Sequence, residues 1–404
     1  MTCTANDLAA AGVAVWLDDL SRPKVTSGEL THMVKAGRIV GITTNPTIFS
    51  KSISAGSGYE DQLRELALRG TAIGETLRLL TAWDVRAACD VLRPIYDRTI
   101  RDGRVSIEVD PRISGDAERT AAEARGLWWL IDRPNLFIKI PATKAALPAI
   151  TASIADGISV NVTLIFSIDR YRAVLDAFMS GLEQRTAAGG DLTGIESVAS
   201  FFISRVDTEV DKRLVVFPGS EAPARLHGQA ALANARLAYE VYEEAASSVR
   251  WQALAAKGAS LQRLLWASTG VKDEAFAPTR YVTELVAAHT VNTMPEATLN
   301  AMDEIDEPIR NTISNRYEEA RRTVDELVTM GIDFADVADV LEREGVASFV
   351  QSWDDLIASV ESQLRNAGAE VMPAGAVKPA SGSDFSSAAP AAAAPGRTAR
   401  DEHA

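Results

Sequence analysis

One lysine of the chain stands out because it lies inside an apolar, strand-like segment. Lys139 occurs in NLFIKIPA, residues 135–142, with large apolar neighbours on both sides. Burial among such residues disfavours the charged ammonium form, and a neutral amine can attack a carbonyl carbon to form a Schiff base. The alternative is an edge-strand lysine whose aliphatic stem reaches water. Its place late in the segment favours the catalytic interpretation, because the active sites of α/β barrels lie at the C-terminal strand ends.

Acidic residues near the ends of two other strand-like segments could move protons beside this amine. Asp18 follows VAVWL, and Glu108 lies within VSIEVDP. An acid among strand residues is costly unless it has partners, and in a closed barrel it can point into a central polar layer and serve in proton transfer. A structural ion pair or a turn cap is the alternative, and it suits Asp19 and Asp110 better. The alternation of the segment does not decide between Asp18 and Asp19.

Hydroxyl and amide side chains end two further segments. Asn161 and Thr163 are two residues apart and therefore share one face of a strand. The end of the earlier segment carries Thr43, Thr44 and Asn45. These side chains suit hydrogen bonds to substrate hydroxyls and to a catalytic water, whereas turn formation and helix capping are their ordinary roles.

Two late segments combine hydroxyls, a glycine and cations, which are the groups that a phosphate needs. For the arginine, a surface ion pair is the alternative. The residues are Ser200, Phe202, Ser204 and Arg205 in one segment, and Ser268, Thr269, Gly270 and Lys272 in the next.

Eight apolar runs, most of them rich in β-branched residues, alternate with stretches of helical period. This alternation predicts parallel strands in a (β/α)8 TIM barrel. An open doubly wound sheet is the alternative, but no GxGxxG follows the first run. Helix N-caps are expected at Gly115 or Asp116, at Ser167 and at Asp207. The runs lie at 13–20, 37–45, 104–111, 135–142, 158–167, 198–205, 264–270 and 289–295.

Residues 1–367 are expected to form a single barrel domain, and the segments outside the eight βα units are expected to add helices to it. Residues 46–103 and 205–262 each carry at least two helical patterns and are predicted to be helical insertions. Residues 296–366 read as wholly helical, which predicts a C-terminal helix across the barrel mouth. Residues 368–404 are rich in Ala, Pro and Ser, a composition that predicts a disordered tail, with a docking segment as the alternative.

Composition excludes several classes of function. The 404 residues are 47% hydrophobic and 24% charged, with a net charge of -14, which disfavours nucleic acid and anionic membrane surfaces as partners. Two cysteines make no disulfide framework, and four scattered histidines form no HExxH motif. No Walker A, nucleotide, flavin or metal signature occurs. Without a long apolar run or a signal-peptide pattern, a cytoplasmic protein is expected.

Six motifs in order resemble those of the transaldolases of the pentose phosphate pathway, in particular the longer bacterial branch, over residues 10–365. They are GITTNPTIF, VSIEVDP, NLFIKIPAT, GISVNVTLIFS, ASFFISRVD and WASTGVKD. The resemblance implies transfer of a dihydroxyacetone unit from sedoheptulose 7-phosphate or fructose 6-phosphate to glyceraldehyde 3-phosphate or erythrose 4-phosphate. It implies sugar phosphates as partners and no metal or organic cofactor. Because barrels can pair through their outer helices, both a monomer and a homodimer are open.

The resemblance also implies roles for individual residues. Lys139 would form the Schiff base, and Asp18 would take and return the proton of the hydroxyl whose carbon–carbon bond breaks. Glu108 would work with Thr163 and a water in forming and hydrolysing the imine. The residues implied for substrate hydroxyls, with the aromatic ring as a wall, are Thr43, Asn45, Asn161, Ser200 and Phe202.

The phosphate site departs from the family pattern at one position. The resemblance assigns the phosphate to Arg205 and Ser268. Where other members carry a second arginine, this chain has Gly270, so Lys272 is expected to supply the second positive charge. Its ammonium group acts as a point charge and lacks the bidentate hydrogen bonding of a guanidinium group.

Two other functions stay open at this point. A class I aldolase would release free dihydroxyacetone and would share nearly all of these sequence features. A catalytically silent sugar-phosphate binding protein would be expected to lack Lys139, Asp18 or Glu108, yet all three are present.

Overall fold

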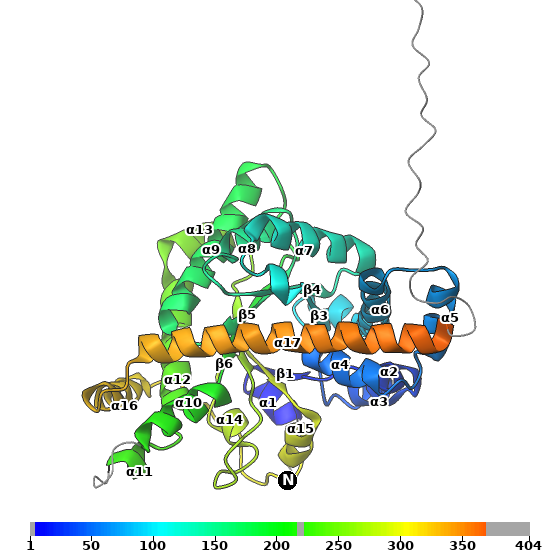
Figure 1. Ribbon diagram of the computed structural model, residues 1–404. Coiled ribbons are helices and arrows are strands. Elements are labelled where there is room, and N and C mark those ends of the chain that lie inside the picture. Colours follow the sequence, from blue (N-terminus) through cyan, green and yellow to red (C-terminus); the bar gives the residue numbers. More distant parts are fainter. Residues whose placement is uncertain (1–4, 216–221, 369–404) are drawn as a thin grey trace, which may run out of the picture.

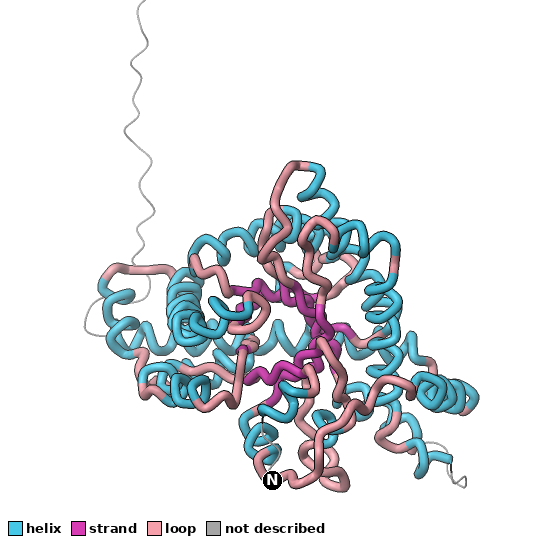
Figure 2. Tube along the Cα trace, turned by 180° about the vertical axis from the view of Figure 1, so that it is seen from behind, coloured by secondary structure: helices cyan, strands magenta, loops and turns pink. Residues whose placement is uncertain are grey.

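The computed structural model describes residues 5–215 and 222–368. Within them, eight parallel strands close into a barrel in chain order, so the (β/α)8 prediction is confirmed and the open sheet was the wrong alternative. Figure 2 shows the strands at the centre with helices around them. The strands are β1 (Val13–Leu17), β2 (Gly41–Ile42), β3 (Arg104–Glu108), β4 (Leu136–Pro141), β5 (Val160–Ile165), β6 (Ser197–Phe202), β7 (Arg263–Ala267) and β8 (Thr290–Met294).

Helices follow the strands and fill both insertions, as the helical periods predict. They include a 3-10 turn, η1 (Pro111–Ile113), directly after β3. The helices up to the sixth strand are α1 (Ala5–Ala10), α2 (Arg22–Thr26), α3 (Glu29–Lys35), α4 (Pro46–Ser54), α5 (Glu60–Leu68), α6 (Ile73–Thr99), α7 (Ala117–Ile131), α8 (Leu147–Ala155) and α9 (Ile168–Ala187). Those after it are α10 (Ser204–Leu214), α11 (Ala222–Leu226), α12 (Ala230–Ser247), α13 (Val249–Ala255), α14 (Arg280–Thr283), α15 (Glu296–Met302), α16 (Tyr317–Thr329) and α17 (Phe334–Gly368).

Two of the predicted N-caps are confirmed and one was wrong. Asp116 and Ser167 cap α7 and α9, where their side chains accept hydrogen bonds from backbone N–H groups of the first turn. Asp207 instead lies inside the first turn of α10. Its buried carboxylate accepts from the N–H of Ala231 and the hydroxyl of Tyr281, so it ties α10 to later helices and caps nothing on its own helix.

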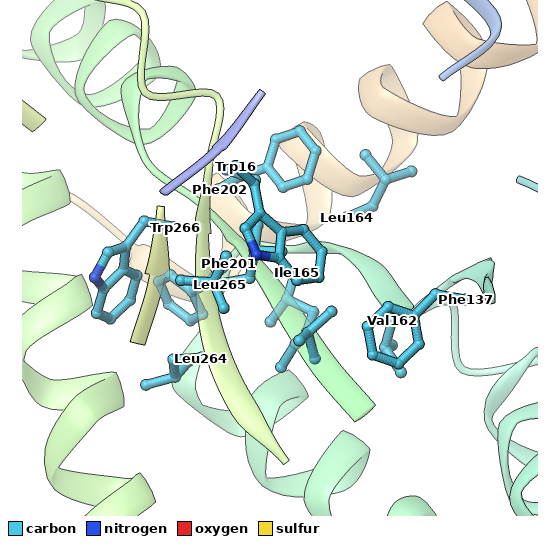
Figure 3. Close-up of a cluster of buried hydrophobic side chains, with 14 of the residues drawn as sticks. Trp16, Phe137, Val162, Leu164, Ile165, Phe201, Phe202, Leu264, Leu265 and Trp266 are labelled. Carbon is cyan, nitrogen blue, oxygen red and sulfur yellow. The ribbon is translucent and has the colours of Figure 1, made fainter. Parts of the chain in front are cut away.

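Large aromatic side chains fill the lower barrel. Trp16 of β1 stacks against Phe137 of β4 with ring centroids 6.0 Å apart, and both lie in the buried cluster of Figure 3. Gly41 pairs with Trp16 in the neighbouring strand, and a Cβ on Gly41 would lie 2.4 Å from the indole ring. Asp18 and Lys139 each follow one of these aromatics by two residues. They therefore share its face, one step nearer the C-terminal strand ends.

A bulge interrupts β5 next to one of the predicted site residues. The register between β5 and β6 shifts between Val162 and Ile165, and Leu164 there has a φ of 60°, a left-handed conformation that is costly for a branched side chain. Bulges re-aim side chains at the rims of barrels. Here the bulge follows Thr163 directly, at the end of the strand where the polar residues gather.

The last helix crosses the C-terminal ends of the strands, as predicted for the barrel mouth. Figure 1 shows α17 running across the strands, and it contacts α4, α5, α6, α10 and β5. Gly345 lets it approach closely, because a Cβ there would lie 3.0 Å from Leu164 and 3.6 Å from the Arg205 guanidinium. The expectation that 296–366 is wholly helical was wrong for 303–316 and 330–333, which form turns and irregular chain.

Residues 369–404, which make up nearly all of the predicted tail, lie outside the described residues. Among the helices that the structure describes, none has the length and apolar character needed to cross a membrane.

Candidate active site

Lys139 lies inside the closed barrel, which rules out the edge-strand alternative. β4 pairs with β3 and β5 on its two sides, with Glu108 and Asn161 as the neighbours of Lys139 in register. The side chain is buried, and its Nζ donates to the carbonyl of Thr44 at 3.1 Å. An ion pair of 3.4 Å joins Nζ to Oε2 of Glu108. An amine held this way faces whatever enters the barrel mouth.

Glu108 combines burial with a lack of hydrogen-bond donors. Neither carboxyl oxygen has a hydrogen-bond partner within the described part of the chain. Burial raises the pKa of Glu108 to about 7, while the nearby charge of Lys139 opposes the shift. A carboxyl group with such a pKa can both give and take a proton near neutral pH. Lys139 is the amine with which Glu108 could exchange a proton, since it lies 3.4 Å away.

The structure distinguishes the two adjacent aspartates. Asp18 lines the cavity above Lys139 and accepts a 2.7 Å hydrogen bond from the hydroxyl of Thr43. Burial raises the pKa of Asp18, with Lys139 opposing the shift. Asp19 instead pairs with Lys24 at 3.2 Å, outside the cavity lining. The ambiguity that alternation left open is therefore decided in favour of Asp18 as the cavity residue.

Beneath the cavity, an amide is held between two hydroxyls. Asn161 donates to Ser106 at 3.0 Å and accepts from Ser200 at 2.7 Å. Asn161 is buried and does not line the cavity, whereas Ser200 and Thr163 do. The hydroxyl of Thr163 has no partner among the described residues, so it is available to a group in the cavity.

Asn45 serves two purposes. Its side chain accepts from the N–H of Ile48 at 3.0 Å and so caps α4, which is the ordinary role that the sequence allowed. It also lines the cavity, together with Thr43. The cap fixes the Asn45 side chain at the point where the chain leaves β2, at the edge of the cavity.

The far wall of the cavity carries a cation. The guanidinium of Arg205, at the start of α10, stands 5.3 Å from the ring centroid of Phe202. No carboxylate lies within ion-pair distance of it in the part of the chain that the structure describes, so the surface ion-pair alternative was wrong. Ser268, at 2.9 Å from the hydroxyl of Ser204, completes this wall. A half-buried cation without a partner beside two hydroxyls favours an anion.

The structure does not bring Lys272 to this wall. β7 ends at Ala267, and the chain then turns outward through Ser268 and Gly270, which leaves Lys272 exposed and outside the cavity lining. A contact between Lys272 and a bound phosphate stays a prediction.

Sequence reasoning missed three residues of the cavity lining: Ala267, Thr293 and Phe349. Phe349 of α17 covers Lys139, with Nζ 5.4 Å from its ring centroid. Thr293, near the end of β8, contacts the hydroxyl of Thr43 at 2.6 Å. The polar hydroxyl at the end of HTVNTM was a usable signal. For the ring of Phe349, the sequence offered no signal beyond its helical spacing with Leu341 and Leu356. Which side of a helix faces the barrel depends on packing, which the spacing does not show.

Together these residues surround a cavity of about 90 Å³ at the C-terminal ends of the strands. Glu108 instead lines a second cavity of about 520 Å³, between α6, α7 and α17, which shares Asn45 with the small cavity. Within the described ranges, no group of three or more His, Cys, Asp or Glu side chains could hold a metal ion. The small cavity is lined by Asp18, Thr43, Asn45, Lys139, Thr163, Ser200, Phe202, Arg205, Ala267, Ser268, Thr293 and Phe349.

Known proteins with similar sequences point to one family. The family model described as transaldolase/fructose-6-phosphate aldolase matches residues 15–360. A transaldolase of Parafrankia sp. (strain EAN1pec) is 57% identical over 368 residues, which cover 91% of this chain and 100% of that protein. A transaldolase of Thermobifida fusca (strain YX) is 58% identical and covers 88% of this chain and 97% of its own length. Transaldolase 2 of Streptomyces coelicolor is 54% identical, with 90% and 98% covered. This chain therefore belongs to the transaldolase/fructose-6-phosphate aldolase family.

Proposed function

We propose that the protein is a transaldolase that moves a dihydroxyacetone unit from a ketose phosphate to an aldose phosphate through a Schiff base on Lys139. The observation that carries the proposal is the placement of one buried amine, 3.4 Å from Glu108, in a cavity that also presents Asp18 and the cation of Arg205. Transaldolases that are 54% to 58% identical over about nine-tenths of the chain support the same activity.

In the first step, Glu108 takes a proton from the ammonium group of Lys139 across their 3.4 Å contact. The neutral amine then attacks the keto carbon of fructose 6-phosphate or sedoheptulose 7-phosphate. The carbinolamine must then lose its hydroxyl as water to become an imine. Glu108, with its pKa raised to about 7 by burial, donates the proton that this departure needs. The unpaired hydroxyl of Thr163 is suited to hold the departing water. The reverse sequence hydrolyses the imine at the end of the cycle.

In the second step, Asp18 takes the proton from the hydroxyl at the fourth carbon while the bond between the third and fourth carbons breaks. The electron pair of that bond moves into the protonated imine and forms an enamine, and the aldose phosphate leaves. The acceptor aldehyde then reacts with the enamine, and Asp18 returns the proton to the new hydroxyl. Burial, which raises the pKa of Asp18, strengthens the carboxylate as a base for this task.

Arg205 and Ser268 are proposed to hold the phosphate of donor and acceptor, because both line the cavity and supply a guanidinium group and a hydroxyl. Thr43, Asn45 and Ser200 are proposed to bind substrate hydroxyls from the cavity wall. Asn161 is proposed to act through Ser200, since its amide accepts the hydroxyl proton of that serine at 2.7 Å. Phe202 is proposed as an apolar wall beside Arg205.

The proposal is tested by trapping the covalent intermediate. The full chain is incubated with fructose 6-phosphate and borohydride, and mass spectrometry of the digested protein locates the adduct. A dihydroxyacetone adduct is expected on Lys139, and both the adduct and transfer to erythrose 4-phosphate or glyceraldehyde 3-phosphate are expected to vanish in Lys139→Ala. Lys144→Ala, which removes a lysine from the exposed loop after β4, is the matched control and is expected to keep both.

Each other outcome has a defined meaning. Full transfer activity in Lys139→Ala would refute the proposed mechanism. Release of free dihydroxyacetone at the same rate with and without an acceptor aldehyde would identify an aldolase instead. Binding of fructose 6-phosphate without any adduct or product would identify a silent binding protein.

A further inference from the structure

A chain of two hydroxyl groups runs from the last strand of the barrel to the carboxylate of Asp18. Thr43 lies 2.7 Å from Oδ1 of Asp18 and 2.6 Å from the hydroxyl of Thr293. Both threonines are buried and line the cavity that holds Lys139. The role of Thr293 is not accounted for by the reaction as proposed above.

Barrel closure is what makes this contact possible. β8 pairs with β1, with Thr293 opposite Trp16, and β1 pairs with β2 on its other side. Backbone bonds continue this pairing past the strand ends, from the N–H of Asp18 to Met294 and from the N–H of Thr43 to Leu17, each at 2.9 Å. The three side chains therefore meet above three adjacent strands.

The direction of the hydrogen bonds follows from counting protons. A threonine hydroxyl has a single proton to donate, and an ionised carboxylate can only accept. Thr43 must give its proton to Asp18, so its oxygen must accept at the second contact. Thr293 is then the donor to Thr43. Successive hydrogen bonds of one direction polarise each other and strengthen the last bond of the chain.

We propose that Thr293 is a positioning residue for Asp18, acting through Thr43 to hold one oxygen of the carboxylate and leave the other for the substrate hydroxyl. The inference rests on the proposed transaldolase function. Within the described chain, no hydrogen bond from another side chain to this carboxylate is found, so the arrangement of Oδ1 depends on the two threonines. The hydroxyl of Thr269, from the end of β7, donates to the carbonyl of Thr293 at 2.8 Å and fixes it in place.

The charges around Asp18 set the pH at which the effect is seen. Lys139 of β4 and Arg205 of α10 favour the ionised carboxylate, while the neighbouring Asp19 disfavours it. The charge of Asp18 in turn raises the pKa of Glu108 of β3. Burial raises the pKa of Asp18 above its ordinary value. A hydrogen bond that is strengthened by Thr293 favours the charged form, so its loss should move the pKa of Asp18 further up.

The test separates bond cleavage from imine formation. Thr293→Val keeps a branched side chain but removes the donor, and Thr293→Ser keeps the hydroxyl. In the Val variant, kcat for cleavage of fructose 6-phosphate should fall about two- to tenfold, as expected for the loss of one hydrogen bond between neutral groups. On the acidic limb of the pH profile, where Asp18 loses its proton, the pH of half-maximal kcat should rise. The rate of borohydride-trappable imine formation should stay unchanged, and Thr293→Ser should restore both kcat and the pH profile.

A double variant shows whether the effect passes through Thr43. Thr293→Val should add nothing to the loss caused by Thr43→Val, because the chain is already broken. An unchanged pH profile with wild-type cleavage in Thr293→Val would overturn the proposal, and so would equal losses in the Val and Ser variants. If Thr293→Val does not fold, Thr293→Ala replaces it, with the same expected results. Failure of the proposed function would show itself separately, as the absence of any trapped adduct on the wild-type chain.

Discussion

Replacement of Arg205 by Gln offers a quantitative test of the anion wall of the cavity. The guanidinium is half-buried, stands 5.3 Å from the ring of Phe202, and has no acidic partner within ion-pair distance in the described residues. Its removal therefore leaves no carboxylate without an ion-pair partner. The loss should fall on the bound anion.

The magnitude follows from the loss of a charge pair at a partly desolvated site. Removing one partner of such a hydrogen-bonded pair costs about 2 to 5 kcal/mol. With about 1.4 kcal/mol for each factor of ten, kcat/KM for fructose 6-phosphate should fall by about thirtyfold to a few thousandfold. The ring of Phe202 loses its cation, but this contributes a smaller term of about 0.5 to 2 kcal/mol.

The assay compares phosphorylated and unphosphorylated substrates. Transfer from fructose 6-phosphate to erythrose 4-phosphate should suffer the full loss in Arg205→Gln. With fructose as donor and glyceraldehyde as acceptor, wild type and variant should be nearly equal. Lys212→Gln is the matched control, because it removes a cation from the same helix at an exposed position, and its activity should equal that of the wild type. Equal losses of Arg205→Gln with both substrate pairs would refute the reasoning.

Three further perturbations test the barrel and its supports. Between its ordinary pKa of 4.5 and about 7, Glu108 holds a proton in the folded chain but not in the unfolded chain. As the pH rises through this window, the wild-type free energy of unfolding should therefore fall relative to that of Glu108→Gln, as measured by urea unfolding at several pH values. A difference that stays constant with pH would contradict the burial argument. Asp84→Ala should lower the free energy of unfolding by about 3 to 5 kcal/mol, because it leaves the charge of Arg22 buried without its ion-pair partner, and a loss below about 1 kcal/mol would contradict this. Gly41→Ala should cost about 1 to 3 kcal/mol in the same assay, because the added Cβ would lie 2.4 Å from the indole of Trp16; a variant as stable as wild type would show that the indole has room to move.

The sequence predicts the barrel well because its signals are local. Short apolar runs such as those around Val162 and Leu265 mark strands that are buried on both faces, and the helical periods between them mark the connections. The family resemblance and the apolar neighbours of Lys139 then select the amine. All eight strands form where the runs predict them. Each strand is shorter than its run, because polar residues at the ends of the runs, such as Asp18, Thr43 and Ser268, lie in the loops after the strands.

The tertiary structure alone decides which polar side chains meet. Thr293 and Thr43 lie 250 residues apart, and closure of the barrel brings their hydroxyls to 2.6 Å. Packing also turns Phe349 toward Lys139 and leaves Lys272 exposed. The spacing of residues along a strand or helix fixes which side chains share a face, and the sequence contains that spacing. Contacts between distant elements depend on how the elements pack, and no local pattern contains that information.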